Sequence, residues 1–307
     1  FRAGHFNGIN FVDHPGGSLM NDRAIDASIQ ERIAAGQEVR TFRMTTNLFG
    51  AGFIEAIDSN TLQTLANSQP AAQRGTFIQV PVLEAPGNVR GGRFGWKNQH
   101  ASLISFAADA YLNEMGITSP LQPTENTSTG NSVADFDGVA DPEDDGEDID
   151  LFALFMRSLK VPPRDDVLAA TPSAQNGSNL FNAIGCAVCH VRNIDTAPAG
   201  TVINGGAFTV PDALGSKTIH PFSDFLMHNV GTGDGIVQNG GQGTRNQLRT
   251  PPLWGMRVRP RLMHDGATVS RTDAILRHGG QASSARNNFA SLSLSQQNNV
   301  IDFLNSL

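Results

Sequence analysis

Two cysteines and a histidine stand together as a CxxCH pattern formed by Cys186, Cys189 and His190. Two thiols at this spacing can add to the two vinyl groups of a haem, and the histidine that follows is then placed to bind the iron. Residues 178–185 before the motif carry apolar side chains at helical spacing, which predicts a short helix that ends at a glycine. The motif therefore predicts a haem c bound covalently through Cys186 and Cys189, with His190 as its proximal ligand.

Two other kinds of site can contain a pair of cysteines. A thioredoxin-like dithiol is expected within a βαβ pattern, which the residues around this motif do not have. A structural zinc site needs four ligands, and the chain contains only two cysteines. Covalent haem is the better interpretation of the motif.

The sequence offers several candidates for the ligand on the other face of the iron. Met or His is the common choice, and the candidates after the motif are Met227, His228, Met256, Met263, His264 and His278. Spacing alone does not choose among them. His278 ends a predicted helix at 271–277 and precedes Gly279, a residue that lets the backbone approach a porphyrin or that simply ends the helix.

Arginines crowd one part of the chain after the motif. Haem propionates are carboxylates that need cationic partners, although a solvated basic surface explains the same cluster. The arginines concerned are Arg245, Arg249, Arg257, Arg259 and Arg261.

Composition limits the partners and the location of the protein. The chain has 307 residues, a net charge of −7 and no apolar run long enough to span a bilayer. Nucleic acid is therefore not expected as a partner, whereas a redox protein or a small electron donor is. Both cysteines are committed to the haem, which indicates a periplasmic or otherwise exported protein. The chain begins at Phe1 without a signal sequence, so we expect a removed signal peptide or a missing upstream segment.

The hydrophobic pattern predicts a mainly α, loop-rich fold. Apolar residues at helical spacing predict helices at about 101–115, 149–159 and 294–307. The segments 40–49 and 201–210 are expected to be extended, and residues 16–18 form a glycine-rich loop. A Pro-, Ala- and Ser-rich linker at 161–177 divides the chain into an N-terminal domain, 1–165, and a C-terminal haem domain, 166–307.

An acidic segment precedes the second of these helices. Nine of the sixteen residues from Asp135 to Asp150 are acidic. An EF-hand is excluded, because the twelfth position counted from Asp141 is Phe152 and not a glutamate. The segment is therefore expected to be solvated surface, and Ca²⁺ is left open as a further ion.

A glycine-rich turn at 91–97 holds Trp96, one of only two tryptophans. Core packing is the usual role of such a residue. The functional alternative is an electron relay or a wall of the haem pocket.

Five stretches of the chain resemble the family of di-haem c-type oxidoreductases, which is related to the bacterial di-haem cytochrome c peroxidases. The stretches lie at 48–57, 92–97, 249–255, 262–267 and 274–280, so the resemblance covers most of the chain. It implies cytochrome c-like haem domains of the di-haem peroxidase superfamily. The family usually has two CxxCH motifs and this chain has one, so we expect the other motif, with a second haem, upstream of Phe1.

The resemblance also implies roles for particular residues. It puts the second axial ligand at His278, fourteen positions after His264, where the peroxidases carry methionine. Trp96 matches an inter-haem tryptophan and Glu114 a catalytic glutamate, although the asparagine before Glu114 is one residue closer than in the peroxidases. Phe106 replaces a polar glutamine near the peroxide site, which leaves the substrate open between peroxide, oxygen and others.

These features together predict a periplasmic, peroxidase-like haem oxidoreductase. Electrons would enter at the haem on His190 and His278, pass near Trp96 and reach a reactive haem beside Glu114. The main alternative is a non-catalytic electron-transfer cytochrome c, and a third is an oxygenase built on the same scaffold.

Overall fold

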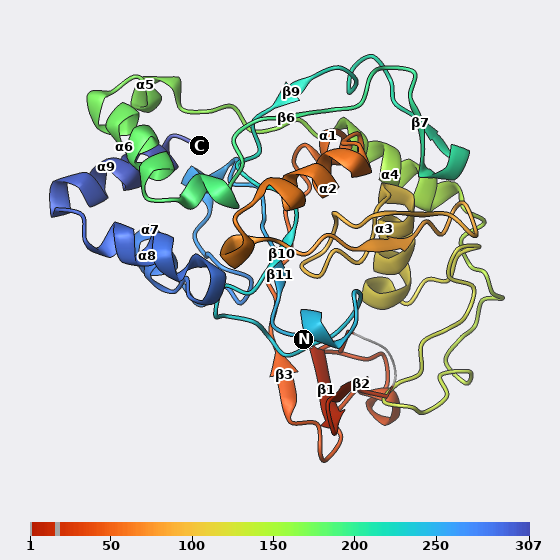
Figure 1. Ribbon diagram of the computed structural model, residues 1–307. Helices are drawn as coiled ribbons and strands as arrows, with labels where there is room; N and C mark the ends of the chain where they lie inside the picture. Colours follow the sequence, from red (N-terminus) through yellow and green to blue (C-terminus); the bar gives the residue numbers. More distant parts are fainter. Residues whose placement is uncertain (1, 16–18) are drawn as a thin grey trace.

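The computed structural model describes residues 2–15 and 19–307 (Figure 1). The predicted mainly α fold is wrong: helices make up 34% of the chain and strands 13%. Most of the remainder is loop, and the strands are too short to produce a clear alternating pattern in the sequence. The loop expected at 16–18 lies outside the described residues.

One group of helices comes from the N-terminal half of the chain. It consists of α1 (Ala51–Glu55), α2 (Ser59–Ser68), α3 (Leu103–Ala110) and α4 (Glu147–Ser158). Helix α3 continues as a π-helical turn, Tyr111–Met115, and ends at Gly116, whose φ of 69° is left-handed. Helices α3 and α4 were both predicted from their apolar spacing, and their inner faces share one core. That core includes Ile57, Leu103, Ala107, Ile149 and Met156.

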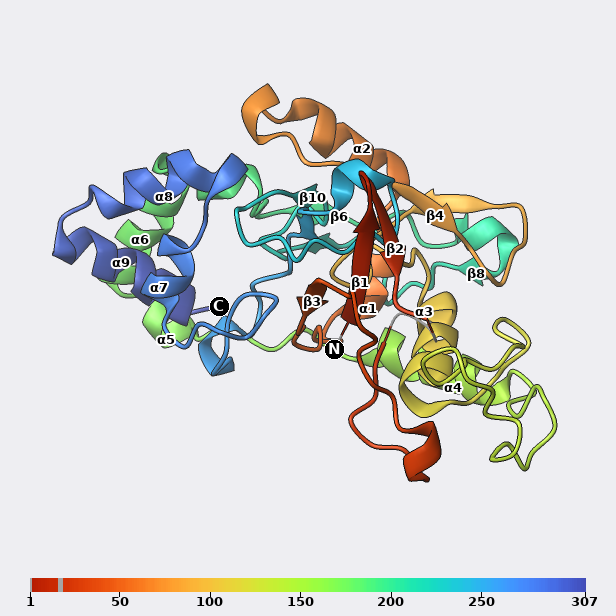
Figure 2. The ribbon, with the colours of Figure 1, turned by 90° about the horizontal axis from the view of Figure 1, so that it is seen from below.

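A second group of helices surrounds the CxxCH motif. It consists of α5 (Asp166–Ala169), α6 (Pro172–Ala183), α7 (Arg271–Leu276), α8 (Ser283–Ala290) and α9 (Leu294–Asn305). The stretch 161–177, expected as a linker, contains α5 and the start of α6. Helices α6 and α9 pack closely around Phe181 and Phe303, whose ring centroids are 5.2 Å apart. Figures 1 and 2 show α5 to α9 together on one side of the molecule and α1 to α4 on the other.

The strands form five small antiparallel sheets. The largest has the order β2-β1-β3 and is made by β1 (Arg2–Asn7), β2 (Asn10–Asp13) and β3 (Val39–Thr41). The other four sheets each pair two strands. They are β4 (Gln79–Pro81) with β5 (Val89–Gly91), β6 (Ile194–Asp195) with β9 (Thr218–Ile219), β7 (Val202–Ile203) with β8 (Phe208–Thr209), and β10 (Met227–His228) with β11 (Leu248–Arg249).

Buried charged side chains hold the loops where regular structure is sparse. Arg90 donates to the backbone carbonyls of Glu55 and Ile57 at 2.6 and 2.8 Å, and fully buried Arg93 also donates to Ile57. The Glu55 carboxylate pairs with Arg157 of α4 at 2.7 Å. These bonds satisfy backbone groups that would otherwise be buried without partners, so the loops around α1 are fixed in place.

Candidate functional site

The CxxCH motif forms a single helical turn directly after α6. Gly185 has a φ of 95°, which reverses the chain so that the 3-10 turn Cys186–Val188 can begin. The amide of His190 then donates to the carbonyl of Cys186 at 3.0 Å. This compact turn presents Cys186, Cys189 and His190 to one cavity.

The cavity has a volume of about 420 Å³ and is lined mainly by apolar side chains. Its walls come from distant parts of the chain: residues 44–47 and Trp96, the CxxCH turn, the segment 248–264, and helices α7 to α9. It therefore lies between the second helix group and the loops that follow β3 and β11.

His190 is held in the form that can bind a metal. Its Nδ1 lies 2.9 Å from the backbone carbonyl of Phe222, so Nδ1 donates and Nε2 keeps its lone pair. Burial lowers the pKa of His190 to about 4, so the ring is neutral at physiological pH. A neutral imidazole with one nitrogen tied to a carbonyl is the usual state of a metal-bound histidine.

His278 repeats this arrangement on another wall of the same cavity. It follows α7, and its Nδ1 lies 2.8 Å from the carbonyl of Ala274, one helical turn earlier. Burial also lowers the pKa of His278. The two histidines thus offer two free Nε2 atoms to one space.

The other candidate ligands are placed differently. His264, Met256 and Met263 line the cavity, and Nδ1 of buried His264 has no hydrogen-bond partner. Met227 and His228 form strand β10 and do not line it. Met227 is fully buried in a separate apolar cluster with Ile78, Val80 and Ala101.

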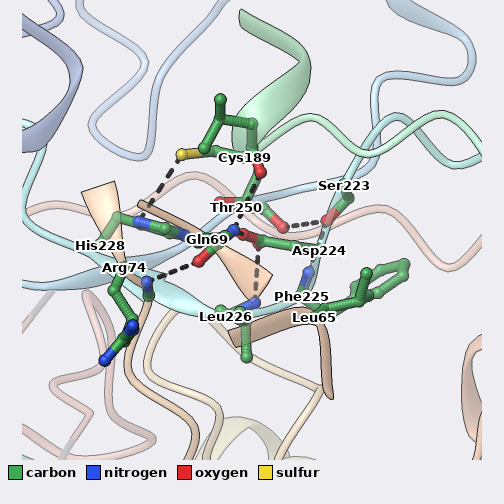
Figure 3. A network of polar contacts seen from close by, with 12 residues as sticks. Leu65, Gln69, Arg74, Cys189, Ser223, Asp224, Phe225, Leu226, His228 and Thr250 are labelled. Carbon is green, nitrogen blue, oxygen red and sulfur yellow. Dashed lines mark hydrogen bonds and ion pairs between the residues drawn. The ribbon is translucent and has the colours of Figure 1, made fainter. Parts of the chain in front are cut away.

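His228 belongs to a buried polar network behind the motif (Figure 3). Its Nε2 bonds the carboxylate of Asp224 at 2.7 Å, and its Nδ1 lies 3.7 Å from Sγ of Cys189. Gln69, which follows α2, donates both to Asp224 at 2.7 Å and to the carbonyl of Val188 at 2.9 Å. Both nitrogens of His228 are occupied, and the network ties the CxxCH turn to the N-terminal half of the chain. Sequence reasoning missed Asp224 and Gln69, because no local pattern connects residues so far apart.

The two cysteines are buried enough to stay uncharged. Burial raises the pKa of Cys186 to about 12, and burial together with the carboxylate of Asp224 raises that of Cys189. A thiol that is hard to ionise is a weak nucleophile, so this pair does not suit a reactive dithiol.

Of the two residues matched to peroxidase positions, the structure brings only one to the cavity. Trp96 lines it, donates from Nε1 to the carbonyl of Met44 at 2.6 Å, and lies edge-on to His264. Glu114 is exposed on the π-helical turn after α3 and does not line the cavity.

The acidic segment brings three carboxylates near one another. Those of Glu125, Asp141 and Glu143 lie within 4.8 Å, and Asp141 is exposed. The Ca²⁺ left open by the sequence had no assigned position and stays a prediction. No described helix is long and apolar enough to cross a membrane.

A comparison with known protein families identifies the family of this chain. Residues 20–307 match the family described as "Di-haem oxidoreductase, putative peroxidase". The chain belongs to this family. Membership of the di-haem oxidoreductases implies haem as the cofactor and confirms the resemblance seen in the sequence.

Three solved structures show weaker similarities. A MauG-like protein associated with microbial copper homeostasis is 15% identical, with a TM-score of 0.42, over 88% of this chain and 93% of the other. Hydrazine synthase from Kuenenia stuttgartiensis is 15% identical, with a TM-score of 0.36 and coverages of 94% and 100%. The di-haem peroxidase BthA from Burkholderia thailandensis E264 is 14% identical, with a TM-score of 0.34 and coverages of 68% and 60%. A search of curated proteins found no match. These similarities are too weak to assign an activity.

The residues around the cavity fit the haem that this di-haem oxidoreductase family requires. Cys186 and Cys189 provide two neutral thiols, and His190 and His278 provide two neutral imidazoles in one apolar space. A c-type haem with two histidine ligands uses this combination of donors.

Proposed function

We propose that this chain binds one haem c covalently through Cys186 and Cys189, with His190 and His278 as axial ligands. The observation that carries the proposal is the pairing of two histidines in one cavity, each with Nδ1 bonded to a backbone carbonyl. His264 also borders the cavity, but its Nδ1 has no hydrogen-bond partner that would orient the ring. Met227 is too far from the cavity to compete.

A haem in this pocket would supply a reversible one-electron centre. The chain's own residues would hold it in a fixed coordination, because the carbonyls of Phe222 and Ala274 orient both imidazoles. The apolar walls would exclude water. With both axial positions taken by imidazole, this centre would pass electrons and would not readily bind peroxide or oxygen.

We further propose that the centre is where electrons enter a peroxidase-like oxidoreductase. Trp96 supports this role, because its aromatic ring borders the cavity and is fixed by the bond to Met44. Catalysis would then occur elsewhere, at a second haem, with Glu114 moving a proton to the substrate. Glu114 is exposed and does not line this cavity, so it could act only at a reactive site other than this one.

The proposal also includes the location of the protein, its electron donor and its division into domains. Covalent haem supports a periplasmic or otherwise exported location, and a redox protein or a small donor would deliver the electrons. The proposed division into domains 1–165 and 166–307 assigns this haem to the second domain.

Two experiments test the proposal: extraction of the haem from denatured protein, and an assay of electron transfer and peroxide turnover. After denaturation and acid–acetone extraction, the haem absorbance should stay with the protein, and Cys186→Ala/Cys189→Ala should release it. The haem-loaded chain should be reduced by a donor and reoxidised by an acceptor, with little turnover of peroxide. Extractable haem in the wild type would refute covalent binding. Rapid peroxide turnover by the chain alone would refute the electron-entering role and show that one axial position is open.

If a form that carries two haems turns over peroxide, Glu114→Gln should slow it by about 10²–10⁴-fold, the usual loss for a positioned acid or base. Glu147→Gln is a suitable control, because it also removes one exposed carboxylate from the N-terminal half and does not line the cavity. An unaffected rate in Glu114→Gln would show that Glu114 does not move the proton.

A further inference from the structure

Two arginines at the edge of the cavity carry charges that no carboxylate balances. Arg249 is only 5% exposed, and its Nη1 has no hydrogen-bond partner. Nη2 of Arg259 is buried and unpartnered in the same way. Both side chains line the cavity, and no described carboxylate forms an ion pair with either.

The two guanidinium groups also repel each other. Burial and the charge of Arg259 lower the pKa of Arg249 to about 10, and burial lowers that of Arg259. Both groups remain charged at neutral pH. Arg90 and Arg93 are also buried without an ion pair, but backbone carbonyls accept from their guanidinium groups. Arg249 and Arg259 keep a nitrogen without any such acceptor, and they border a cavity in which an anion could balance their charge. A solvated basic patch does not explain these two residues, since their unpartnered nitrogens are shielded from water.

We propose that Arg249 and Arg259 form a carboxylate site that binds the propionates of the haem held by Cys186 and Cys189. This inference rests on the proposed function. Guanidinium groups bind carboxylates through two parallel N–H donors, and both arginines border the cavity without an ion pair to any described carboxylate. Arg271, whose Nε is also buried and unpartnered, lies on the same cavity wall and can assist.

The other contacts of Arg249 show how the site would orient the haem. Its Nε donates to the carbonyl of Gly95 at 2.8 Å, and its backbone amide donates to the carbonyl of Trp96 at 2.8 Å. The guanidinium is therefore fixed before any ligand arrives. The thioether edge of the haem would lie at the CxxCH turn, and the propionate edge would lie toward the segment that carries Trp96.

The test is the midpoint potential of the haem-loaded protein, together with the resonance Raman band for propionate bending. A nearby cation favours the reduced haem, so Arg249→Gln should lower the potential and shift the band. We expect at least a tenfold change in the ferric-to-ferrous ratio at a given potential, which is about 59 mV for one electron. Arg249→Lys keeps the charge but loses the bond to Gly95, so it should lower the potential less than Arg249→Gln does.

Arg245→Gln is the matched control. It removes the same charge from an exposed residue that does not line the cavity, and the potential and the band should stay unchanged. Arg259→Gln repeats the test at a less buried residue if Arg249→Gln does not fold.

Several results would overturn the assignment. The first is that Arg249→Gln and Arg259→Gln both keep covalent low-spin haem and show an unchanged potential and Raman band. This result would reject the arginine site but leave the proposed function intact. The second combines two observations: the midpoint potential of the wild type changes with added acetate, and the propionate band of the variants does not change. The arginines would then bind a free anion and not the haem propionates. Wild-type protein without covalent haem would instead reject the proposed function itself.

Discussion

Asp224 is expected to be the residue that holds the CxxCH turn against the N-terminal half of the chain. Its side chain is fully buried, and it accepts from Nε2 of His228, from Nε2 of Gln69 and from the amide of Leu226 at 2.7, 2.7 and 2.9 Å. Asp224→Ala removes both acceptor oxygens and with them all three hydrogen bonds. Gln69 keeps its bond to Val188, but the other two donors are left buried without partners.

The magnitude follows from these contacts. Each buried donor left unsatisfied costs about 1–3 kcal/mol, so the two donors orphaned in Asp224→Ala should lower the free energy of unfolding by about 2–6 kcal/mol. Asp224→Asn keeps one acceptor oxygen but turns an NH₂ group toward donors and loses a charge-assisted bond. It should cost about 1.5–3 kcal/mol.

Urea unfolding followed by circular dichroism, at equal haem content, measures these differences. Asp212→Ala is the control, because Asp212 is exposed, and it should stay within about 0.5 kcal/mol of wild type. A double-mutant cycle with Gln69→Ala should give a coupling energy above about 0.5 kcal/mol, as expected for residues in contact. A loss below about 1 kcal/mol in Asp224→Ala, well under the cost of two orphaned donors, would refute the role of the network.

Two further predictions concern stability elsewhere. Gly177→Ala should destabilise the protein by about 1–3 kcal/mol, because a Cβ there would lie 1.8 Å from the carbonyl oxygen of Asn299 and push α6 from α9. Asp234→Asn should cost about 3–5 kcal/mol, because it leaves buried Arg43 and Lys97 without their counter-charge. Burial alone would raise the pKa of Asp234, but Arg43 and Lys97 outweigh it and lower the pKa below 3.8. The stabilisation that the Asp234 carboxylate provides is therefore present above about pH 4. It is lost as the pH falls through the pKa of Asp234 in the folded protein, which is lower than the unfolded value.

Thermal and urea unfolding check both predictions. Gly243→Ala is the control for Gly177, because a Cβ there meets nothing within 4 Å. A wild-type stability for Gly177→Ala would mean that the helix packing is looser than described. For Asp234→Asn, the difference from wild type should shrink in acid. A difference that does not change with pH down to the acid transition would contradict the charge argument.

The parts of the fold that the sequence predicted are those with a local repeat. Helices α3, α4 and α9 have apolar residues at helical spacing, and one buried face is enough to identify them. The CxxCH turn was equally clear, since its five residues carry the chemistry themselves. Strands of two or three residues, such as β10, are too short for a periodic signal.

The long-range polar contacts were not predictable. Arg93 is fully buried and donates to the backbone carbonyls of Ile54 and Ile57. Asp224 accepts from Gln69, which lies 155 positions earlier in the chain. Such pairs depend on the final position of loops and leave no spacing in the sequence. The sequence did indicate an arginine cluster, but only the structure separates buried, unpartnered Arg249 from exposed Arg245.

The axial ligation of the iron is the most direct test of the account. The oxidised, haem-loaded chain should show the absorption and electron paramagnetic resonance spectra of low-spin haem with two imidazole ligands, without the charge-transfer band of methionine ligation. His278→Ala should give high-spin or ligand-exchangeable haem, whereas His264→Ala, which changes another histidine on the cavity wall, should keep the low-spin spectrum. A low-spin spectrum that survives in His278→Ala and is lost in His264→Ala would contradict the pairing of His190 with His278.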